Sequence, residues 1–432
     1  MKRFTMLFAV VTGLAMIFLH TGKAHAIPAF ARQYKTECNT CHTIFPDRNP
    51  FGEAFRRNSY VWPGKLSEQK QQEAKFTAED EKKTAQEWLV TIPDLVPVAF
   101  WVQHDFIYNK NRFDDTGKKM PQFDLDGETE FEVFTGGSFR DKAGWWAEYN
   151  FAPEKELGEA YIQFRKPFTL PLNVKAGKFK PQLSLWKPND SATLSEYGYY
   201  GMVVGQTATA TTTTTGNPFE IGREQGGVEI NSIIGNRVFV ATGLVTPPEK
   251  DRNGPDCYGH VSVRIGGTDF NGNAPVISLD RESVWDDLAL TFGTFGYYGS
   301  ATNVTTDPTT LAILSTNAND FYRLGLESEV LYKKLRLRIS GILGRDKNPQ
   351  GLGTSEMSRF FMAQGQYLLM KNLLAAMRFE YQDIATEGIV QRYIPSVTYA
   401  PWQNIRLALE YVGEHKADAV KREATVRISF AF

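Results

Sequence analysis

The residues best suited to chemistry are Cys38 and Cys41, which are followed at once by His42. Two cysteines separated by two residues and followed by a histidine form the attachment signature of c-type haem. This spacing lets the two thiols reach the two vinyl groups of one haem, while the imidazole reaches the iron as its proximal ligand. We therefore predict a single cofactor, one covalent haem c, bound through Cys38, Cys41 and His42.

Other uses of the cysteines fit the sequence less well. A thioredoxin-like CxxC motif needs a βαβ pattern around it, and the region shows none. A structural zinc site needs two further ligands at suitable spacing, which the region does not offer. A disulfide between Cys38 and Cys41 leaves His42 without a role. The third cysteine, Cys257, is expected to be a lone thiol in or beside a strand.

The distal ligand of the iron is harder to identify. Residues 27–90 contain no methionine and no histidine other than His42. Of the histidines further along the chain, His104 is the nearest, followed by His260 and His415. Strand alternation puts His104 on the apolar face of its segment, which would point to lipid, so it is only a possible distal ligand. A five-coordinate iron stays open, and no residue is assigned a catalytic role.

The elements that must position this motif begin with an export signal. Lys2 and Arg3 precede an apolar stretch at 5–19, and the Ala-His-Ala sequence at 24–26 matches a cleavage site. The apolar stretch is shorter than the roughly 20 residues that span a bilayer as a helix. Residues 1–26 are therefore predicted to be a signal peptide, which suits the motif because haem c is attached beyond the inner membrane.

The net charge of the mature chain limits the classes of partner that it can bind. Cleavage would remove Lys2, Arg3 and Lys23 and no acidic residue, which leaves 45 basic and 49 acidic residues and a formal charge of −4. A negative chain argues against a nucleic-acid partner. No later stretch reaches 18 consecutive apolar residues, so no transmembrane helix is expected. Barrel strands escape this test because lipid-facing and lumen-facing residues alternate along them.

Two short regions precede the rest of the chain. Residues 27–65 carry the haem motif and are predicted to be a small, helical monohaem cytochrome c segment. Some 40 residues are too few to stay folded without help from a cofactor or a partner surface. Residues 66–94 are rich in Glu, Lys, Gln and Ala, and are predicted to be a charged helical linker.

Residues 95–432 show short segments in which apolar and polar side chains alternate. In one of them, Leu335, Leu337 and Ile339 alternate with Arg336 and Arg338. A soluble sandwich would not turn arginines into its core, whereas a transmembrane barrel with a polar lumen requires this pattern. We predict a mainly β fold, an outer-membrane β-barrel of about 16 antiparallel strands. The basic residues at the alternating strand positions that are predicted to face the lumen are Arg165, Lys175, Arg336, Arg338, Arg378, Arg406 and Arg427.

Turn lengths give a second argument for the barrel. Tight turns are expected at 235–236, 333–334, 371–372 and 402–403. Longer connections are expected at 180–226, 345–356, 383–387 and 413–421. Short turns on one side and long loops on the other are typical of outer-membrane barrels. Residues 267–285 break the pattern, and the sequence offers no interpretation of them.

The haem segment should lie near the periplasmic mouth. Both ends of an even-stranded barrel lie on the periplasmic side, so the segment begins there. Because the membrane core is about 30 Å thick, one haem cannot carry electrons across it alone. The haem segment is therefore expected on the periplasmic side or within the barrel lumen.

Several residues point to a known family. The Phe-Ala-Arg-Gln-Tyr sequence at 30–34, the Cys-Asn-Thr-Cys-His motif, Phe45-Pro46 and Phe51-Gly52 precede a porin-like barrel. This arrangement resembles the monohaem cytochrome–porin fusions of the bacterial outer membrane. Residues 174–179 look like a strand of the phosphate-selective type of porin. Carried over, Cys38, Cys41 and His42 would hold the haem, and the family supplies no distal ligand.

The resemblance implies an outer-membrane iron oxidase, an Fe(II):cytochrome c oxidoreductase. Its partners would be extracellular Fe(II), a periplasmic c-type cytochrome that accepts one electron at a time, and outer-membrane lipid. Two other functions stay open. One is an anion-selective, porin-like channel with a haem plug, since the inward basic residues outnumber Glu159, Glu380 and Glu410. The other is electron transfer with a donor other than iron. The inward arginines can equally pair with carboxylates of the plug or with haem propionates.

Overall fold

The computed structural model describes most of the chain from Ala29 onward. The described residues are 29–34, 36–63, 98–109, 123–124, 128–139, 142–153, 155–167, 170–187, 192–198, 202–208, 212–215, 217–219, 222–246, 254–273, 284–416 and 419–431. The predicted signal peptide, 1–26, and the predicted linker, 66–94, lie outside them. Among the described residues, no helix is long and apolar enough to span a membrane.

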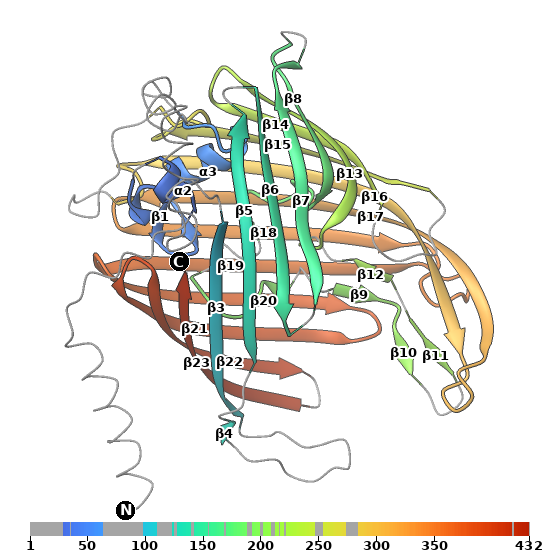
Figure 1. Ribbon diagram of the computed structural model, residues 1–432. Helices are drawn as coiled ribbons and strands as arrows, with labels where there is room; N and C mark the ends of the chain where they lie inside the picture. The colour runs from blue at the N-terminus through green and yellow to red at the C-terminus, as the bar shows by residue number, and fades with distance from the viewer. Residues whose placement is uncertain are drawn as a thin grey trace, which may run out of the picture.

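The N-terminal segment folds into five short elements. They are α2 (Ala29–Gln33), the 3-10 turn η1 (Cys38–Thr40), β1 (His42–Ile44), β2 (Asp47–Arg48) and α3 (Pro50–Arg57). β1 and β2 pair in an antiparallel hairpin. Figure 1 shows this blue segment at one end of the molecule, near the C-terminus of the last strand.

Sixteen of the described strands form a closed antiparallel barrel, as predicted. The first and last strands, β3 and β23, pair with each other, and β8 pairs with β13. The barrel strands are β3 (Val98–Asn109), β5 (Thr129–Phe139), β6 (Ala143–Ala152), β7 (Glu156–Arg165), β8 (Asn173–Phe179), β13 (Gln225–Ile234), β14 (Val238–Thr246), β15 (Asp256–Gly266), β16 (Ala289–Thr306), β17 (Ile313–Tyr332), β18 (Leu335–Asp346), β19 (Glu356–Met370), β20 (Leu373–Ile384), β21 (Gly388–Trp402), β22 (Ile405–Lys416) and β23 (Ala419–Ala431).

The predicted alternation holds along these strands. On β18, Arg336 and Arg338 are buried on the lumen side, while Leu337 and Ile339 are exposed on the outer side. Exposed Leu, Ile, Val, Phe and Tyr side chains recur on the outer face of nearly every barrel strand. An outward apolar surface of this kind is how a transmembrane barrel meets lipid. Cys257 is a free thiol on the exposed face of β15, as expected.

Most turns lie where the sequence places them, with three corrections. The hairpin between β21 and β22 turns at 403–404, one residue later than predicted. The connections at 383–387 and 413–421 are shorter than predicted, because β20 continues to Ile384 and β22 to Lys416. Polar residues in these stretches suggested loops, yet the antiparallel pairing continues past the apolar band. A strand in water needs no apolar face to keep its backbone hydrogen bonds.

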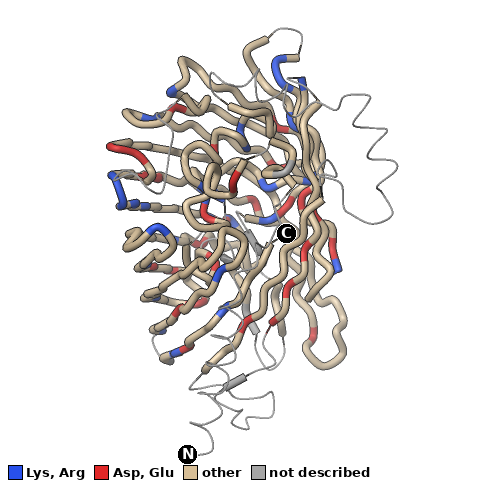
Figure 2. Tube along the Cα trace, turned by 60° about the vertical axis from the view of Figure 1, so that its left-hand side comes forward, with Lys and Arg blue, Asp and Glu red and all other residues tan. Residues whose placement is uncertain are grey.

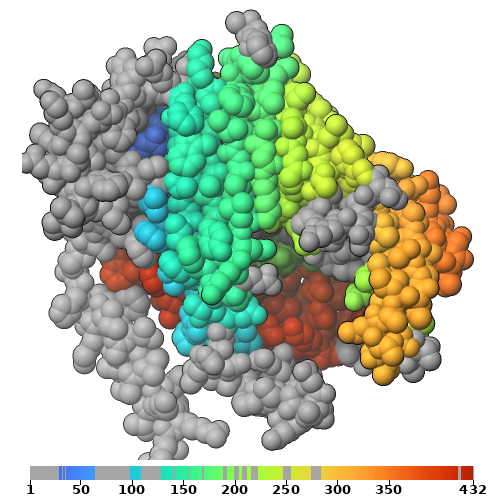
Figure 3. All heavy atoms as spheres, turned by 45° about the vertical axis from the view of Figure 1, so that its right-hand side comes forward, coloured from blue at the N-terminus to red at the C-terminus, as the bar shows by residue number. Residues whose placement is uncertain are grey.

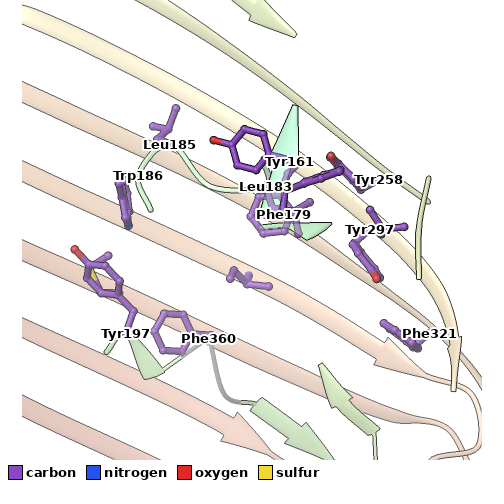
Figure 4. Packing of buried hydrophobic residues seen from close by; sticks show 14 of the residues in the cluster. Tyr161, Phe179, Leu183, Leu185, Trp186, Tyr197, Tyr258, Tyr297, Phe321 and Phe360 are labelled. Atoms are coloured by element: carbon purple, nitrogen blue, oxygen red, sulfur yellow. The ribbon is translucent and has the colours of Figure 1, made fainter. Parts of the chain in front are cut away.

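The connection between β8 and β13 enters the barrel. Leu183, Leu185, Trp186 and Tyr197 are buried there, and Figure 4 shows them against the inner face of the wall strands. Short strand pairs follow, β9 (Met202–Val204) with β12 (Asn217–Phe219), and β10 (Thr207–Ala208) with β11 (Thr213–Thr214), which also pairs with β16. Figure 3 shows a hollow between the green and orange walls, with red strands visible inside it.

The stretch that broke the alternating pattern also turns inward. Phe270, after β15, is buried and packs on Phe239 of β14, with ring centroids 6.2 Å apart. The Arg57 guanidinium lies over both rings, at 4.8 Å from Phe270 and 5.1 Å from Phe239. The chain after β15 therefore covers part of the N-terminal segment rather than forming a tight hairpin. Residues 274–283 lie outside the described residues.

Candidate functional site

The Cys-Asn-Thr-Cys-His motif is held by its own backbone and by one asparagine. The amide of Cys41 donates to the Cys38 carbonyl at 3.2 Å, which closes the 3-10 turn. Asn49 donates through Nδ2 to the carbonyls of Asn39 and Thr40, at 3.2 and 3.0 Å. The amide of Asn49 donates to the Cys41 carbonyl at 3.0 Å. The motif and the start of α3 are therefore fixed to each other.

Asn49 also begins α3. Its Oδ1 accepts from the amide of Gly52 at 2.9 Å, and Pro50 occupies the first turn, where no backbone donor is needed. Gly52 lies so close to the motif that a Cβ there would meet the Cys41 carbonyl oxygen at 2.1 Å. Only glycine allows α3 to approach the motif this closely.

His42 is oriented by a carbonyl. Its Nδ1 lies 3.0 Å from the Pro46 carbonyl oxygen, and a carbonyl can only accept. Nδ1 therefore carries the hydrogen, and Nε2 presents its lone pair, which is the arrangement of a metal-ligating histidine. Burial, together with the nearby Arg48, lowers the pKa of His42 to about 3. The imidazole is therefore neutral and able to bind a metal.

The two thiols are not poised for disulfide exchange. They are free, and no disulfide joins them. Burial raises the pKa of Cys38 to about 11 and that of Cys41 to about 12. Thiol–disulfide catalysts instead lower the pKa of their attacking thiol.

A large cavity lies directly beside the motif. It contains about 1270 Å³ of empty space, part of which is open to solvent. Its lining includes Cys38, Cys41 and His42, aromatic rings, and charged residues from the barrel wall and the lumen segment. Cofactor pockets are typically lined mainly by apolar and aromatic groups with a few polar ones. A largely apolar group with acidic ends suits this lining.

Stacked aromatic rings join the cavity to the barrel wall. Phe30 stacks on Tyr60 at 4.9 Å between centroids, and Tyr60 stacks on Trp146 of β6 at 5.4 Å. Trp146 in turn stacks on Phe134 of β5 at 5.3 Å. Such ring pairs contribute about 0.5–1.5 kcal/mol each beyond their burial. The wall and the N-terminal segment thus form this side of the cavity together.

Ion pairs fix the opposite side of the segment to the barrel. Arg336 of β18 donates through Nη1 to both carboxylate oxygens of Asp47, each at 2.8 Å, and through Nη2 to the Arg48 carbonyl at 2.8 Å. Arg338 lies 3.6 Å from Asp47. The predicted pairing of inward arginines with carboxylates of a plug is therefore confirmed for these two residues.

The other inward basic residues meet groups of the wall or of the lumen segment. Lys175 pairs with Glu229 at 3.0 Å, and Arg427 pairs with Asp105 at 2.6 Å. Arg406 donates to the Ala192 carbonyl. Arg378 pairs with Glu380 and also donates to the lumen segment. Arg165 is half-buried at the short-turn end of β7.

The lumen segment, described over residues 180–187 and 192–198, is bound by carboxylates from several parts of the wall. Glu327 of β17 accepts from the Leu185 amide at 2.7 Å. Glu410 of β22 accepts from the amides of Leu194 and Ser195 at 2.6 and 2.8 Å, and Glu380 of β20 accepts from that of Gly198. The segment also meets the N-terminal segment, because Arg57 donates to the Leu185 carbonyl at 3.1 Å.

The structure does not bring the later histidines to the cavity. His104 lies on the face of β3 opposite the buried Gln103, and its Nδ1 contacts Thr129 Oγ1 at 2.6 Å. His260 is buried on β15 against the Leu183 carbonyl, and His415 is exposed near the end of β22. None of the three lines the cavity. The distal ligand therefore stays unassigned.

Sequence reasoning missed the residues that support the motif. Asn49 followed by Pro50 is a recognisable helix start, so this signal was available. The role of Asp47 was not available, because it depends on an arginine 289 residues away. No group of three His, Cys, Asp or Glu side chains within the described residues is arranged to hold a metal ion.

The fold is similar to that of solved porins. The anion-selective porin from Comamonas acidovorans matches with a TM-score of 0.54 and 11% identity over 78% of this chain and 99% of that chain. The outer membrane channel DcaP of Acinetobacter baumannii gives 0.51 and 11% over 78% and 97%. OprB of Pseudomonas putida gives 0.52 and 9% over 80% and 97%. At these identities the fold alone is shared, and it is that of a porin-like barrel.

No protein-family model and no curated protein sequence matches the chain. The barrel part of the predicted cytochrome–porin fusion is confirmed as a fold. Its cytochrome part stays a prediction.

Proposed function

We propose that this chain is an outer-membrane barrel that carries one haem c at its short-turn end and oxidises extracellular Fe(II). Overall, one Fe(II) becomes Fe(III), and the same electron reduces a periplasmic c-type cytochrome. The observation that carries the proposal is the packing of the Cys-Asn-Thr-Cys-His motif inside the barrel, beside a cavity that the barrel wall completes.

The residues of the motif suit haem c. Cys38 and Cys41 would form the two thioether bonds, and His42 presents Nε2 as an iron ligand because Pro46 holds Nδ1. When bound, the haem supplies a one-electron redox couple. The chain holds the imidazole neutral and correctly turned, and the aromatic wall limits the access of water. Lower polarity and fixed ligation are the means by which proteins tune such a couple.

The place of the site suits transfer toward the periplasm. The motif contacts the turn between β21 and β22, where the Cys38 amide donates to Gln403 Oε1 at 3.0 Å. This turn belongs to the short-turn end of the barrel, which in outer-membrane barrels faces the periplasm. An acceptor would approach there, while Fe(II) would arrive from the long-loop side. Ferric product would then stay outside the cell.

The direct test is stopped-flow absorbance of the purified, detergent-solubilised protein mixed anaerobically with Fe(II). We expect prompt reduction of the haem, with no such change in a His42→Ala protein. A haem that dithionite reduces and Fe(II) does not would overturn iron as the donor. Another donor would then be favoured.

An anion-selective channel is the second candidate. It is favoured by the porin-like fold and by the inward basic residues, and one structurally similar protein is an anion-selective porin. Against it, the inward arginines are engaged by carboxylates and carbonyls of the wall, the lumen segment and the N-terminal segment. A measurement of ion conductance distinguishes the anion channel from the iron oxidase.

The charge of the short-turn end indicates the kind of acceptor. Among the described turn residues at that end, six are basic and either exposed or half-buried, and the exposed acidic residue is Asp287. Glu37 of the N-terminal segment is also exposed, beside the turn at 403–404. The basic ones are Lys142, Lys166, Arg237, Lys333, Lys334 and Lys371. Figure 2 shows Lys and Arg at several hairpin ends on its left side. A rim of one sign steers an oppositely charged partner, so we propose a cytochrome with an acidic face.

A triple variant, Lys333→Gln, Lys334→Gln and Lys371→Gln, tests this rim. We expect electron transfer to an acidic c-type cytochrome to slow on the order of tenfold at low salt, because steering contributes about 10- to 1,000-fold to association rates. The difference should shrink as ionic strength rises. The rate is measured by following cytochrome reduction.

The matched control neutralises three basic residues at the long-loop end, Lys347, Arg359 and Lys421. Those residues lie beside acidic partners there. The control should leave the rate unchanged. Equal slowing by both variants, or no salt dependence, would contradict a steering role for the rim.

A further inference from the structure

We propose that none of the histidines and methionines whose side chains the structure describes occupies the sixth coordination position of the haem iron, and that this position takes small exogenous ligands such as carbon monoxide or imidazole. The inference rests on the proposed function, because it concerns the haem held by His42. It follows from the described side chains that line the cavity.

The first step concerns histidine and methionine. Among the described residues that line the cavity, the one with an imidazole or thioether group is His42 itself. Three histidines lie elsewhere on the barrel, as described above. The methionines whose side chains the structure describes lie on β19 and β20, and none of them lines the cavity. Outside the described residues and the predicted signal peptide, the sequence adds one further candidate, Met120.

The second step concerns the amines in the cavity wall. Lys187 pairs with Glu159, and Lys180 pairs with Glu224 at 2.9 Å. For Lys180, carboxylates led by Glu224 outweigh burial and raise the pKa, which keeps it an ammonium with no lone pair to give to iron. For Lys187, burial lowers the pKa although Glu159 opposes that shift, so its ion pair with Glu159 is what holds it away from iron. Ligation by either lysine would first have to break its ion pair and remove a proton.

The third step concerns the oxygen donors. The Tyr34 hydroxyl donates to the Tyr60 carbonyl at 2.8 Å, and the Tyr60 hydroxyl lies 3.0 Å from that of Tyr161. Burial raises the pKa of both Tyr34 and Tyr60, which keeps these phenols protonated. The Thr36 hydroxyl contacts that of Thr40 at 2.7 Å, and the other side-chain oxygens are carboxylates, which are hard donors and weak ligands for a haem iron.

The test uses the full-length, detergent-solubilised protein with its covalent haem. Magnetic circular dichroism reports the spin state of the oxidised and reduced iron before any addition. Carbon monoxide is then added to the reduced protein, and imidazole is titrated into the oxidised protein. We expect high-spin iron in both states, one carbon monoxide bound per haem, and conversion to low-spin iron by imidazole.

Low-spin iron before any addition would overturn the inference, and so would high-spin iron that takes neither ligand. In the low-spin case, Met120→Leu, His104→Gln and Lys187→Gln identify the ligand, since the correct variant becomes high-spin. These outcomes differ from a failure of the proposed function. A protein without covalent haem would count against that function, and so would a haem that Fe(II) does not reduce. In the second case the spin state of the attached haem still tests the inference independently.

Discussion

An Arg336→Met protein should hold its N-terminal segment in the barrel less firmly, by about 3–5 kcal/mol, which is the usual cost of removing one partner of a buried ion pair. Arg336 makes a bidentate contact with Asp47, and the two side chains are 2% and 1% exposed. Removing the guanidinium leaves the Asp47 carboxylate buried, with Arg338 at 3.6 Å as its nearest cation. The carbonyl of Arg48 loses its donor as well.

Hydrogen exchange resolved by mass spectrometry measures this loss. We expect peptides covering residues 38–57 to exchange faster in the Arg336→Met protein by roughly two to four orders of magnitude, the factor that corresponds to 3–5 kcal/mol of local opening. Peptides from distant barrel strands should not change. The attached haem should also become more accessible to added ligands.

Two further variants test whether the faster exchange comes from the loss of the Arg336–Asp47 pair. The double variant Arg336→Met with Asp47→Asn should recover much of the protection, because the uncompensated carboxylate is gone. The control is Arg359→Met, which breaks an exposed pair with Asp383 at 3.6 Å and should cost at most about 1 kcal/mol. Unchanged exchange in Arg336→Met would mean that the aromatic contacts alone hold the segment.

Strand periodicity was enough to predict the barrel because the polarity of each strand residue depends on whether its side chain faces the lipid or the lumen. The stretch Leu335 to Ser340 shows which side chains face inward without any knowledge of their partners. The same logic failed at 383–387 and 413–421, where polar residues suggested loops although β20 continues to Ile384 and β22 to Lys416. At 403–404 the prediction missed by one residue, since turn position depends on register as well as composition.

The site was predictable to a smaller extent. The spacing of Cys38, Cys41 and His42 reports chemistry directly, because covalent attachment requires that spacing. The contact between Arg336 and Asp47 could not be predicted, since it exists only once the segment docks inside the barrel. The path of residues 180–198 was equally hidden. Its leucines and aromatic residues fit a buried loop, but nothing local shows that wall carboxylates bind its backbone.

The lumen segment decides whether this barrel conducts. A barrel of this size leaves an aqueous channel unless something fills it. Here Glu327, Glu380 and Glu410 accept from backbone amides of the segment, and Arg378 donates to the Glu196 carbonyl. Hydrogen bonds to charged groups contribute about 1.5–3 kcal/mol each, so several of them hold the segment firmly across the lumen. The native protein should therefore conduct poorly.

Removing the whole connection between β8 and β13 should open the channel without removing any of the sixteen barrel strands. Phe179 of β8 is paired in register with Gln225 of β13, so a four-residue Gly-containing turn can replace residues 180–224. In planar bilayers we expect conductance to rise on the order of tenfold or more, since the filled lumen becomes water-filled. Shortening the exposed turn at 308–311 is the matched control and should change nothing. A native protein that already conducts chloride in porin-like steps would contradict this prediction and favour the anion-channel function, because ions would then have a path beside the segment.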